Sequence, residues 1–138
     1  SLLLIGDGGE KEKVTSLADE YLPTRYHIFS APHHFMSGFY TSADVFTLVS
    51  TSSEAFGIVY LEAMATNLPV VATDDPQRRE IIGNAGLLVN PENINQYANA
   101  LDQAISTNWD DRPRNQAKKF SWDIIAAKYN KLFKSLTN

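Results

Sequence analysis

Two glutamates, Glu54 and Glu62, are the residues of this 138-residue chain whose setting points most directly to chemistry. Glu62 is the one charged residue between positions 57 and 65, in an apolar run that predicts a buried helix. A carboxylate there is costly to bury unless a polar partner accompanies it. That partner is either a ligand diol or, in the alternative, a core tyrosine or an amide of a neighbouring strand. Glu54 lies in the loop before the helix, where it either binds a ligand or caps the helix.

The start of the same helix predicts an anion-binding site. The amides of Gly57, Ile58 and Val59 have no partner within the helix, and they lie at the positive end of its dipole. Gly57 has no side chain, so a ligand can approach the backbone closely. No lysine or arginine occurs between Tyr26 and Gln77. An anion bound by this part of the chain must therefore rely on backbone amides or on cations elsewhere in the protein.

A second loop with ligand-binding character is the glycine-rich turn at residues 6–9, directly after an apolar segment. Its glycines either form a tight turn with positive φ angles or let a ligand approach the backbone at Gly6 and Gly8. The dinucleotide fingerprint does not fit, because Lys11 stands where that motif has glycine, and no P-loop Gly-Lys-Ser/Thr follows.

Several classes of chemistry are excluded by composition. The chain has no cysteine, and no suitably spaced carboxylate accompanies its three histidines, so we predict no metal site. No arrangement of serine, histidine and aspartate suggests a hydrolase. The net charge of −4 argues against nucleic acid as a partner. The apolar runs span four or five residues, well short of the roughly eighteen that cross a bilayer.

The elements that must position these residues alternate along the chain. Short apolar segments predict strands, and segments with helical spacing lie between them. We expect strands at residues 2–5, 26–29, 45–49, 70–72 and 86–89, and helices at 10–22, 34–42, 57–66, 77–82 and 93–106. This order predicts an α/β fold, a Rossmann-like three-layer sandwich with a parallel sheet. Ligands of such folds bind beyond the carboxyl ends of the strands, where the loops at 6–9, 30–34 and 50–56 lie.

The C-terminal part predicts two more helices after a linker at residues 107–111, the last of them capped by Ser121. An apolar stripe runs along that last helix and consists of Trp122, Ile125, Tyr129, Leu132, Phe133 and Leu136. We expect this stripe to dock on the domain while the lysines beside it are solvated. Binding to a membrane surface is the alternative.

Seven short stretches of the sequence together resemble family 4 of the retaining glycosyltransferases, also called group 1. They are Ala43-Asp44-Val45, Ser53-Glu54-Ala55-Phe56-Gly57, Leu61-Glu62-Ala63-Met64-Ala65, Leu68-Pro69-Val70-Val71-Ala72, Arg79-Glu80-Ile81-Ile82-Gly83, Gly86-Leu87-Leu88-Val89 and Phe120-Ser121-Trp122. The resemblance covers nearly the whole chain. It implies the type B fold, in which two Rossmann-like domains face each other across the active-site cleft.

By this resemblance, residues 1–138 form a single nucleotide-sugar-binding domain, the C-terminal domain of the type B fold without its first strand-helix unit. The opening strand at residues 2–5 also suggests a longer protein, since natural proteins rarely begin inside their core. In the family the missing unit carries an arginine and a lysine that hold the diphosphate. Ala55 and Asn67 stand where the family often has glycine.

The resemblance further implies a donor site. Glu54 corresponds to the first glutamate of the family's paired motif, holds the donor sugar and is the residue we expect to be catalytic. Glu62 corresponds to the second glutamate and binds the ribose diol. The other donor-binding residues we predict are Phe56, Gly57 and Ile58 at the sugar and phosphate, the segment from Ser30 to Met36 along the base, and Gly6 and Gly8 in the first turn. No metal and no other cofactor is expected.

The whole enzyme is accordingly expected to transfer a sugar from a nucleoside-diphosphate sugar to an acceptor, and this fragment alone to be inactive. Its expected partners are the sugar nucleotide and a missing N-terminal acceptor domain of the same protein, and not nucleic acid. We expect a cytoplasmic location with peripheral association at the inner face of the membrane. A sugar-nucleotide epimerase of the same fold and a non-catalytic Rossmann-like interaction module are the alternatives.

Overall fold

The first of two compact units in the chain is a small β-α-β arrangement. The computed structural model describes residues 1–50 and 56–136, which divide into the units Ser1–Met36 and Ser37–Asn138. The first contains β1 (Leu2–Ile5), α1 (Lys11–Tyr21), β2 (Tyr26–Phe29) and the short 3₁₀ helix η1 (His33–Phe35). β1 and β2 pair in parallel, with Leu2 opposite Tyr26 and Ile5 opposite Phe29. Both strands have the bounds that the sequence predicted.

The second unit contains a three-stranded parallel sheet in the order β3-β4-β5. Its strands are β3 (Phe46–Leu48), β4 (Val70–Thr73) and β5 (Gly86–Val89). β4 is central, and Val70, Val71 and Ala72 have no exposed surface, as expected for a strand covered on both faces. Strands occur at all five predicted places and every described pair is parallel, which confirms the α/β fold class.

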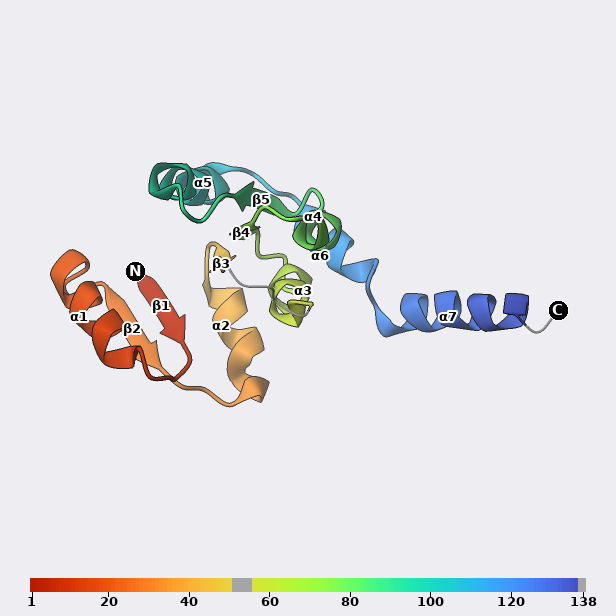
Figure 1. The fold of residues 1–138 in the computed structure, drawn as a ribbon, viewed down its shortest axis with the longest axis horizontal. Coiled ribbons are helices and arrows are strands. Elements are labelled where there is room, and N and C mark those ends of the chain that lie inside the picture. Colours follow the sequence, from red (N-terminus) through yellow and green to blue (C-terminus); the bar gives the residue numbers. More distant parts are fainter. Residues whose placement is uncertain (51–55, 137–138) are drawn as a thin grey trace. The chain divides into compact units, whose positions relative to one another are not determined.

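Helices connect and cover these strands (Figure 1). They are α2 (Met36–Ser42), α3 (Ile58–Ala65), α4 (Pro76–Ile82), α5 (Ile94–Ser106), α6 (Arg112–Lys118) and α7 (Trp122–Leu136). α5 packs on β4 and β5, while α3 and α4 also contact β4. The cluster under α5 consists of Val71, Val89, Ala100, Ala104 and Trp109. The first turn of α3 is held next to the sheet by the Tyr60 hydroxyl, which donates to the Leu48 carbonyl of β3 at 2.9 Å.

Asn67 shows how local sequence ends a helix and fixes its neighbour. It follows α3 in the left-handed conformation, with φ of 71°, which is where asparagine commonly stops a helix. Its side-chain amide donates to the Asp110 carbonyl at 2.7 Å and accepts the Arg114 amide N–H at 3.2 Å. The residue therefore ties the end of α3 to the start of α6.

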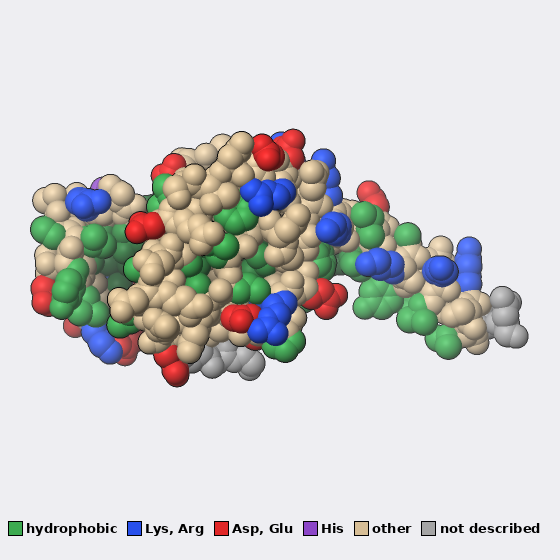
Figure 2. All heavy atoms as spheres, turned by 90° about the horizontal axis from the view of Figure 1, so that it is seen from above, with side chains coloured by type: hydrophobic (Ala, Val, Ile, Leu, Met, Phe, Trp, Pro, Cys, Tyr) green, Lys and Arg blue, Asp and Glu red, His purple; other side chains and the backbone are tan. Residues whose placement is uncertain are grey.

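The final helix differs from its prediction. α7 has no buried residue, and Trp122 is 86 % and Leu136 is 73 % exposed. Hydrophobic and basic side chains both lie on the surface of this segment, at the right of Figure 2. The expectation that the apolar stripe docks on this domain is therefore wrong for the described residues, because only the first turns of α7 lie against other elements. No described helix is long and apolar enough to span a membrane.

Candidate functional site

The start of α3 has a backbone conformation that favours glycine. Gly57 is buried and lies in the left-handed region, with φ of 75° and ψ of 50°, where a side chain would be strained. Its carbonyl accepts the Tyr60 amide at 3.0 Å, which begins the helix. The neighbours Phe56 and Ile58 are exposed. The first amides of α3 therefore lie near the surface of the unit, at the positive end of a helix dipole.

Glu62 is half-buried, and it has a tyrosine partner. The Tyr40 hydroxyl donates to Oε2 of Glu62 at 3.1 Å, and Tyr40 itself is only 5 % exposed. This is one of the alternatives left open by the sequence, the pairing with a core tyrosine. The expectation of an enclosed carboxylate is too strong, because Glu62 lies one helical turn from Ile58, which is 61 % exposed. Its setting is thus polar on one side and open enough for a ligand.

Tyr40 is the first residue near this site that sequence reasoning missed. Its ring packs edge-on against Phe46 with centroids 5.6 Å apart, and Phe46 packs in the same way on Tyr60 at 6.0 Å. Burial and the negative charge of Glu62 raise the pKa of Tyr40 well above its ordinary value. The hydroxyl therefore stays protonated at neutral pH and keeps donating to the carboxylate. No local pattern links Tyr40 to Glu62, which follows it by 22 residues.

A buried arginine, Arg78, is the second residue that was missed. It is 6 % exposed, and its guanidinium forms an ion pair with Asp75 and donates to the hydroxyls of Tyr60 at 3.0 Å and Ser50 at 3.1 Å. The Tyr60 hydroxyl in turn donates to the Leu48 carbonyl at 2.9 Å. These contacts join the end of β3, the first turns of α3 and the start of α4. The sequence signal was the proline-containing helix start at Asp75, with an arginine three residues later.

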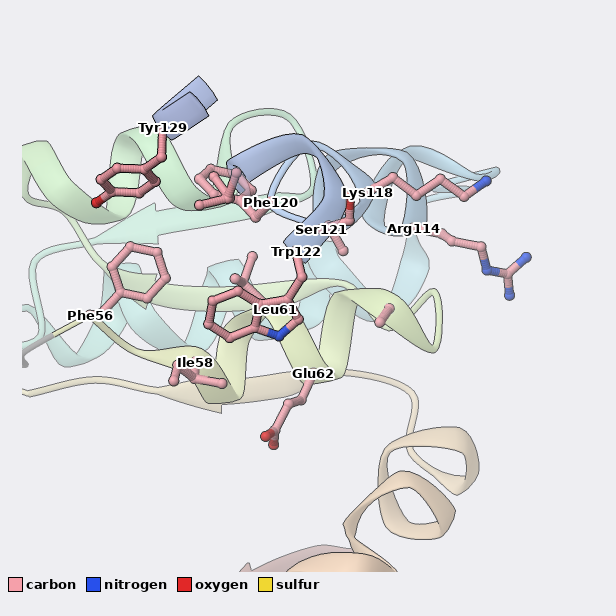
Figure 3. A pocket seen from close by; sticks show the side chains of 13 residues that line it. Phe56, Ile58, Leu61, Glu62, Arg114, Lys118, Phe120, Ser121, Trp122 and Tyr129 are labelled. Atoms are coloured by element: carbon pink, nitrogen blue, oxygen red, sulfur yellow. The ribbon is translucent and has the colours of Figure 1, made fainter. Parts of the chain in front are cut away.

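A hollow of about 800 Å³ lies beside α3 and brings three of the predicted residues together (Figure 3). Phe56, Ile58 and Glu62 line it with residues of α6 and the first turns of α7, among them Trp122 and Tyr129. In Figure 3 the Glu62 carboxylate lies at the margin and points away from the aromatic rings. The interior is mostly apolar, and the polar side chains of its lining are Glu62 of α3, Arg114 and Lys118 of α6, and Ser121, with the hydroxyl of Tyr129 beside them.

The predicted residues Gly6, Gly8 and Ser30 lie together in the first unit. The Ser30 hydroxyl donates to the Gly6 carbonyl at 3.4 Å. A smaller hollow of about 270 Å³ includes both glycines, Asp7 and Lys11 in its lining. These glycines therefore sit where the strands β1 and β2 end, as the fold predicts for ligand-binding loops.

One expectation for this turn is wrong. Neither Gly6, Gly8 nor Gly9 has a positive φ. The turn is instead closed by the Lys11 amide, which donates to the Gly8 carbonyl at 3.2 Å, and the Asp7 carboxylate accepts the adjacent Gly8 amide at 3.0 Å. A Cβ on any of the three glycines would meet no atom within 4 Å, so neither conformation nor crowding within the unit requires glycine. The other reading, close approach of a ligand to this backbone, stays a prediction.

The remaining predicted residues are placed as follows. Met36 begins α2 and is half-buried. Glu54 lies outside the described residues, so no geometry is assigned to it. Gly6, Gly8 and Ser30 belong to the first unit, whereas Phe56, Gly57, Ile58 and Glu62 belong to the second. Within residues 1–50 and 56–136, no group of three or more metal-ligating side chains occurs.

Comparison with known proteins gives one consistent family. A family model described as "Glycosyl transferases group 1" matches residues 1–121. The chain is 33 % identical over 138 residues to a D-inositol 3-phosphate glycosyltransferase of Corynebacterium jeikeium, covering 94 % of the chain and 33 % of that protein. It is 35 % identical over 144 residues to the protein of that name from Corynebacterium urealyticum, covering 95 % of the chain and 33 % of the relative. The chain thus spans about a third of these relatives' length.

Solved structures agree in fold. Sucrose-phosphate synthase from Thermosynechococcus elongatus superposes with a TM-score of 0.77 at 28 % identity, over 98 % of the chain and 40 % of that protein. A chain of the GtfA/B complex has a TM-score of 0.80 at 20 % identity, over 98 % of the chain and 29 % of its own length, and supports the fold alone.

Proposed function

The chain belongs to the group 1 glycosyl transferases, and we propose that it is the domain of a retaining enzyme that binds a nucleoside-diphosphate sugar. The observation that carries this proposal is the start of α3. There a left-handed glycine, an exposed first helical residue, Ile58, and a half-buried glutamate occur within six residues of one another. Such a helix start suits a phosphate group, and a neighbouring carboxylate suits a sugar diol.

In the proposed mechanism the chain stabilises the leaving diphosphate and orients the donor. The amides at Gly57, Ile58 and Val59 point at developing phosphate charge, which is preorganised electrostatic stabilisation. Glu62 accepts hydrogen bonds from the ribose hydroxyls, and Glu54 orients the donor sugar for transfer. No metal ion is needed for these roles.

The cations for the diphosphate come from elsewhere in the whole protein. Residues 27–76 contain no lysine or arginine, and the next cation, Arg78, is already engaged with Asp75, Tyr60 and Ser50. We therefore propose that the chain alone does not transfer sugar and binds nucleotide only weakly, with a dissociation constant in the millimolar range, roughly −4 kcal/mol. Measurable turnover by the isolated chain would contradict this.

The proposed partners follow from the same comparison. An acceptor-binding domain of the same protein would supply the other wall of the cleft, and the relatives are about three times as long as the chain. The exposed stripe of α7 offers an apolar surface for such a domain. Three lysines on α7, Lys128, Lys131 and Lys134, support the further proposal of a cytoplasmic enzyme that associates peripherally with the inner face of the membrane.

A direct test separates the two glutamates by calorimetric titration of the whole protein. Glu62→Gln should weaken the binding of both the free nucleoside diphosphate and the sugar nucleotide by about 1.5–3 kcal/mol, the range for hydrogen bonds to a charged group. Glu54→Gln should weaken the binding of the sugar nucleotide and slow the transfer, while the binding of the free nucleotide should stay nearly unchanged. UDP, GDP and ADP are titrated in parallel, because a pure interaction module binds none of them. If Glu62→Gln stays folded and binds like the parent, the ribose assignment is wrong.

The transferase is favoured over the epimerase alternative. The relatives described above have transferase or synthase names. An epimerase also needs an acid and a base on either side of the reacting carbon, and the described part of α3 contains one titratable carboxylate, Glu62.

A further inference from the structure

We propose that Tyr40 is the positioning residue of Glu62: its hydroxyl fixes the carboxylate in the orientation that accepts the ribose diol. This inference rests on the proposed role of Glu62 in donor binding. It assigns a function to a residue of α2 that has no charge and is almost fully buried, and that the family resemblance did not single out.

The contact itself has the geometry of a directed hydrogen bond. The Tyr40 hydroxyl lies 3.1 Å from Oε2 of Glu62, and at that distance the O–H donates and the carboxylate accepts. The two residues come from different helices, α2 and α3, so the contact does not follow from helical spacing. It limits the rotation of a side chain that is otherwise at the margin of an open hollow.

The hydroxyl is held in place from behind. The Tyr40 ring packs at 86° to Phe46, and Phe46 packs at 72° to Tyr60. Tyr60 is fully buried and is fixed at its own hydroxyl by the Leu48 carbonyl and the Arg78 guanidinium. A continuous row of packed rings therefore connects the Tyr40 hydroxyl to the end of β3.

A carboxylate fixed before binding gives a ligand higher affinity than a mobile one. A glutamate at a helix surface samples several rotamers, and ordering such a side chain on binding costs about 0.5–1.5 kcal/mol, roughly 2- to 12-fold in affinity. The hydrogen bond from Tyr40 orders the Glu62 side chain when the domain folds, so binding no longer carries that cost. Loss of the Tyr40 hydroxyl should therefore weaken the binding of the ribose diol by Glu62 and should leave the binding of other parts of the ligand unchanged.

The experiment deletes one hydroxyl at two places in the whole protein. Tyr40→Phe keeps the packed ring and removes the donor to Glu62. Tyr97→Phe is the matched control, because the Tyr97 hydroxyl lies 2.8 Å from the Thr47 hydroxyl in the same unit. Four variants are titrated: Tyr40→Phe, Tyr97→Phe, Glu62→Gln and the double variant Tyr40→Phe/Glu62→Gln. The ligands are the tightest binder among UDP, GDP and ADP and its 2′-deoxy analogue. Melting temperatures are recorded for each.

The expected result is selective. Tyr40→Phe should bind the ribonucleotide roughly 2- to 12-fold more weakly and the 2′-deoxy nucleotide nearly as the parent does. Tyr97→Phe should bind both like the parent, even where its melting temperature falls. The double variant should bind no more weakly than Glu62→Gln alone, because the two residues act through one carboxylate.

Three results would overturn the inference. If Glu62→Gln weakens binding but Tyr40→Phe does not, the donor site stands and the positioning role is wrong. If Tyr40→Phe weakens both nucleotides equally and in step with its melting temperature, the contact serves folding alone. If Glu62→Gln binds like the parent, or if the parent binds none of the three nucleotides, the assignment of Glu62 falls and this inference falls with it.

Discussion

Helices α3 and α7 are both rich in apolar residues, yet only α3 is covered within the described chain. Tyr60, Ala63 and Met64 of α3 have no exposed surface, whereas α7 has no buried residue at all. An apolar face predicts that a helix will be covered, but it does not identify the covering surface. The difference indicates that α3 belongs to the core of this domain, whereas the described residues bury no residue of α7.

Polar groups follow the same division. Around α3 the buried cation Arg78 has partners in three segments of the chain, namely Ser50 after β3, Tyr60 in α3 and Asp75 before α4. No buried side-chain polar atom among the described residues lacks a partner. On α7 the three lysines are exposed. Mutations in the buried part of α3 and at Arg78 should therefore affect folding far more than mutations in α7.

The largest expected effect comes from breaking the buried ion pair. Arg78→Met should lower the free energy of unfolding by about 3–5 kcal/mol, because it leaves the carboxylate of Asp75 without its cation and two hydroxyls without their donor. Arg79→Met is the control, since Arg79 forms an exposed ion pair with Asp74 and should cost less than about 1 kcal/mol. Urea denaturation measures both. Equal losses would mean that the network around Arg78 does not stabilise the fold.

A second effect compares the two helices directly. Met64→Ala removes a fully buried side chain from α3 and should lower the free energy of unfolding by about 2–5 kcal/mol. Leu132→Ala on α7, where the side chain is 51 % exposed, should change it by no more than about 0.5 kcal/mol. Thermal and urea unfolding of the chain provide the comparison. A similar loss at Leu132 would show that α7 packs on this domain in solution.

A smaller effect should appear in acid. Burial alone would raise the pKa of Asp75, but hydrogen bonds from the Arg78 amide and guanidinium outweigh it and hold the pKa below the ordinary 3.8. A depressed pKa in the folded state means that this stabilisation is present above pH 4 and is lost as the pH falls through the folded value. Asp75→Asn should therefore be less stable than the parent at pH 7, with the gap closing towards pH 3. A gap that is constant with pH would exclude this linkage.

The smallest effect on stability should accompany a change in association. Leu132→Ser combined with Leu136→Ser on α7 should leave the free energy of unfolding within about 0.5 kcal/mol of the parent. The same pair should reduce self-association of the isolated chain, because exposed apolar side chains drive contacts between copies. Sedimentation measured over a range of concentrations tests this. Unchanged association would mean that the stripe is not an adhesive surface.

Prediction from sequence succeeded where local pattern decides the outcome. The five strands, the helix after Gly57 and the stop at Asn67 follow from runs of apolar residues and from residues with special backbone preferences. Tyr40 was missed because its partner Glu62 lies on another helix, and the network of Arg78 was missed because Tyr60 and Ser50 come to it through tertiary packing. The glycine turn at residues 6–9 was misjudged because its backbone turns without a left-handed glycine. The burial of α7 was misjudged because the spacing of its apolar residues does not identify the surface that would cover them.

The two hydrogen bonds of Asn67 have a consequence for how this sequence can vary. Glycine, which the family often has at this position, would adopt the left-handed conformation more easily but would release both Asp110 and Arg114. A variant with glycine at position 67 must therefore hold α6 by other contacts. A redesign of the segment around the start of α6 must keep the Asp110 carbonyl and the Arg114 amide within hydrogen-bond distance of Asn67. Position 67 and the segment at 108–114, which runs into the first turn of α6, therefore depend on each other. Grafting either one alone from a relative should be less well tolerated than grafting both.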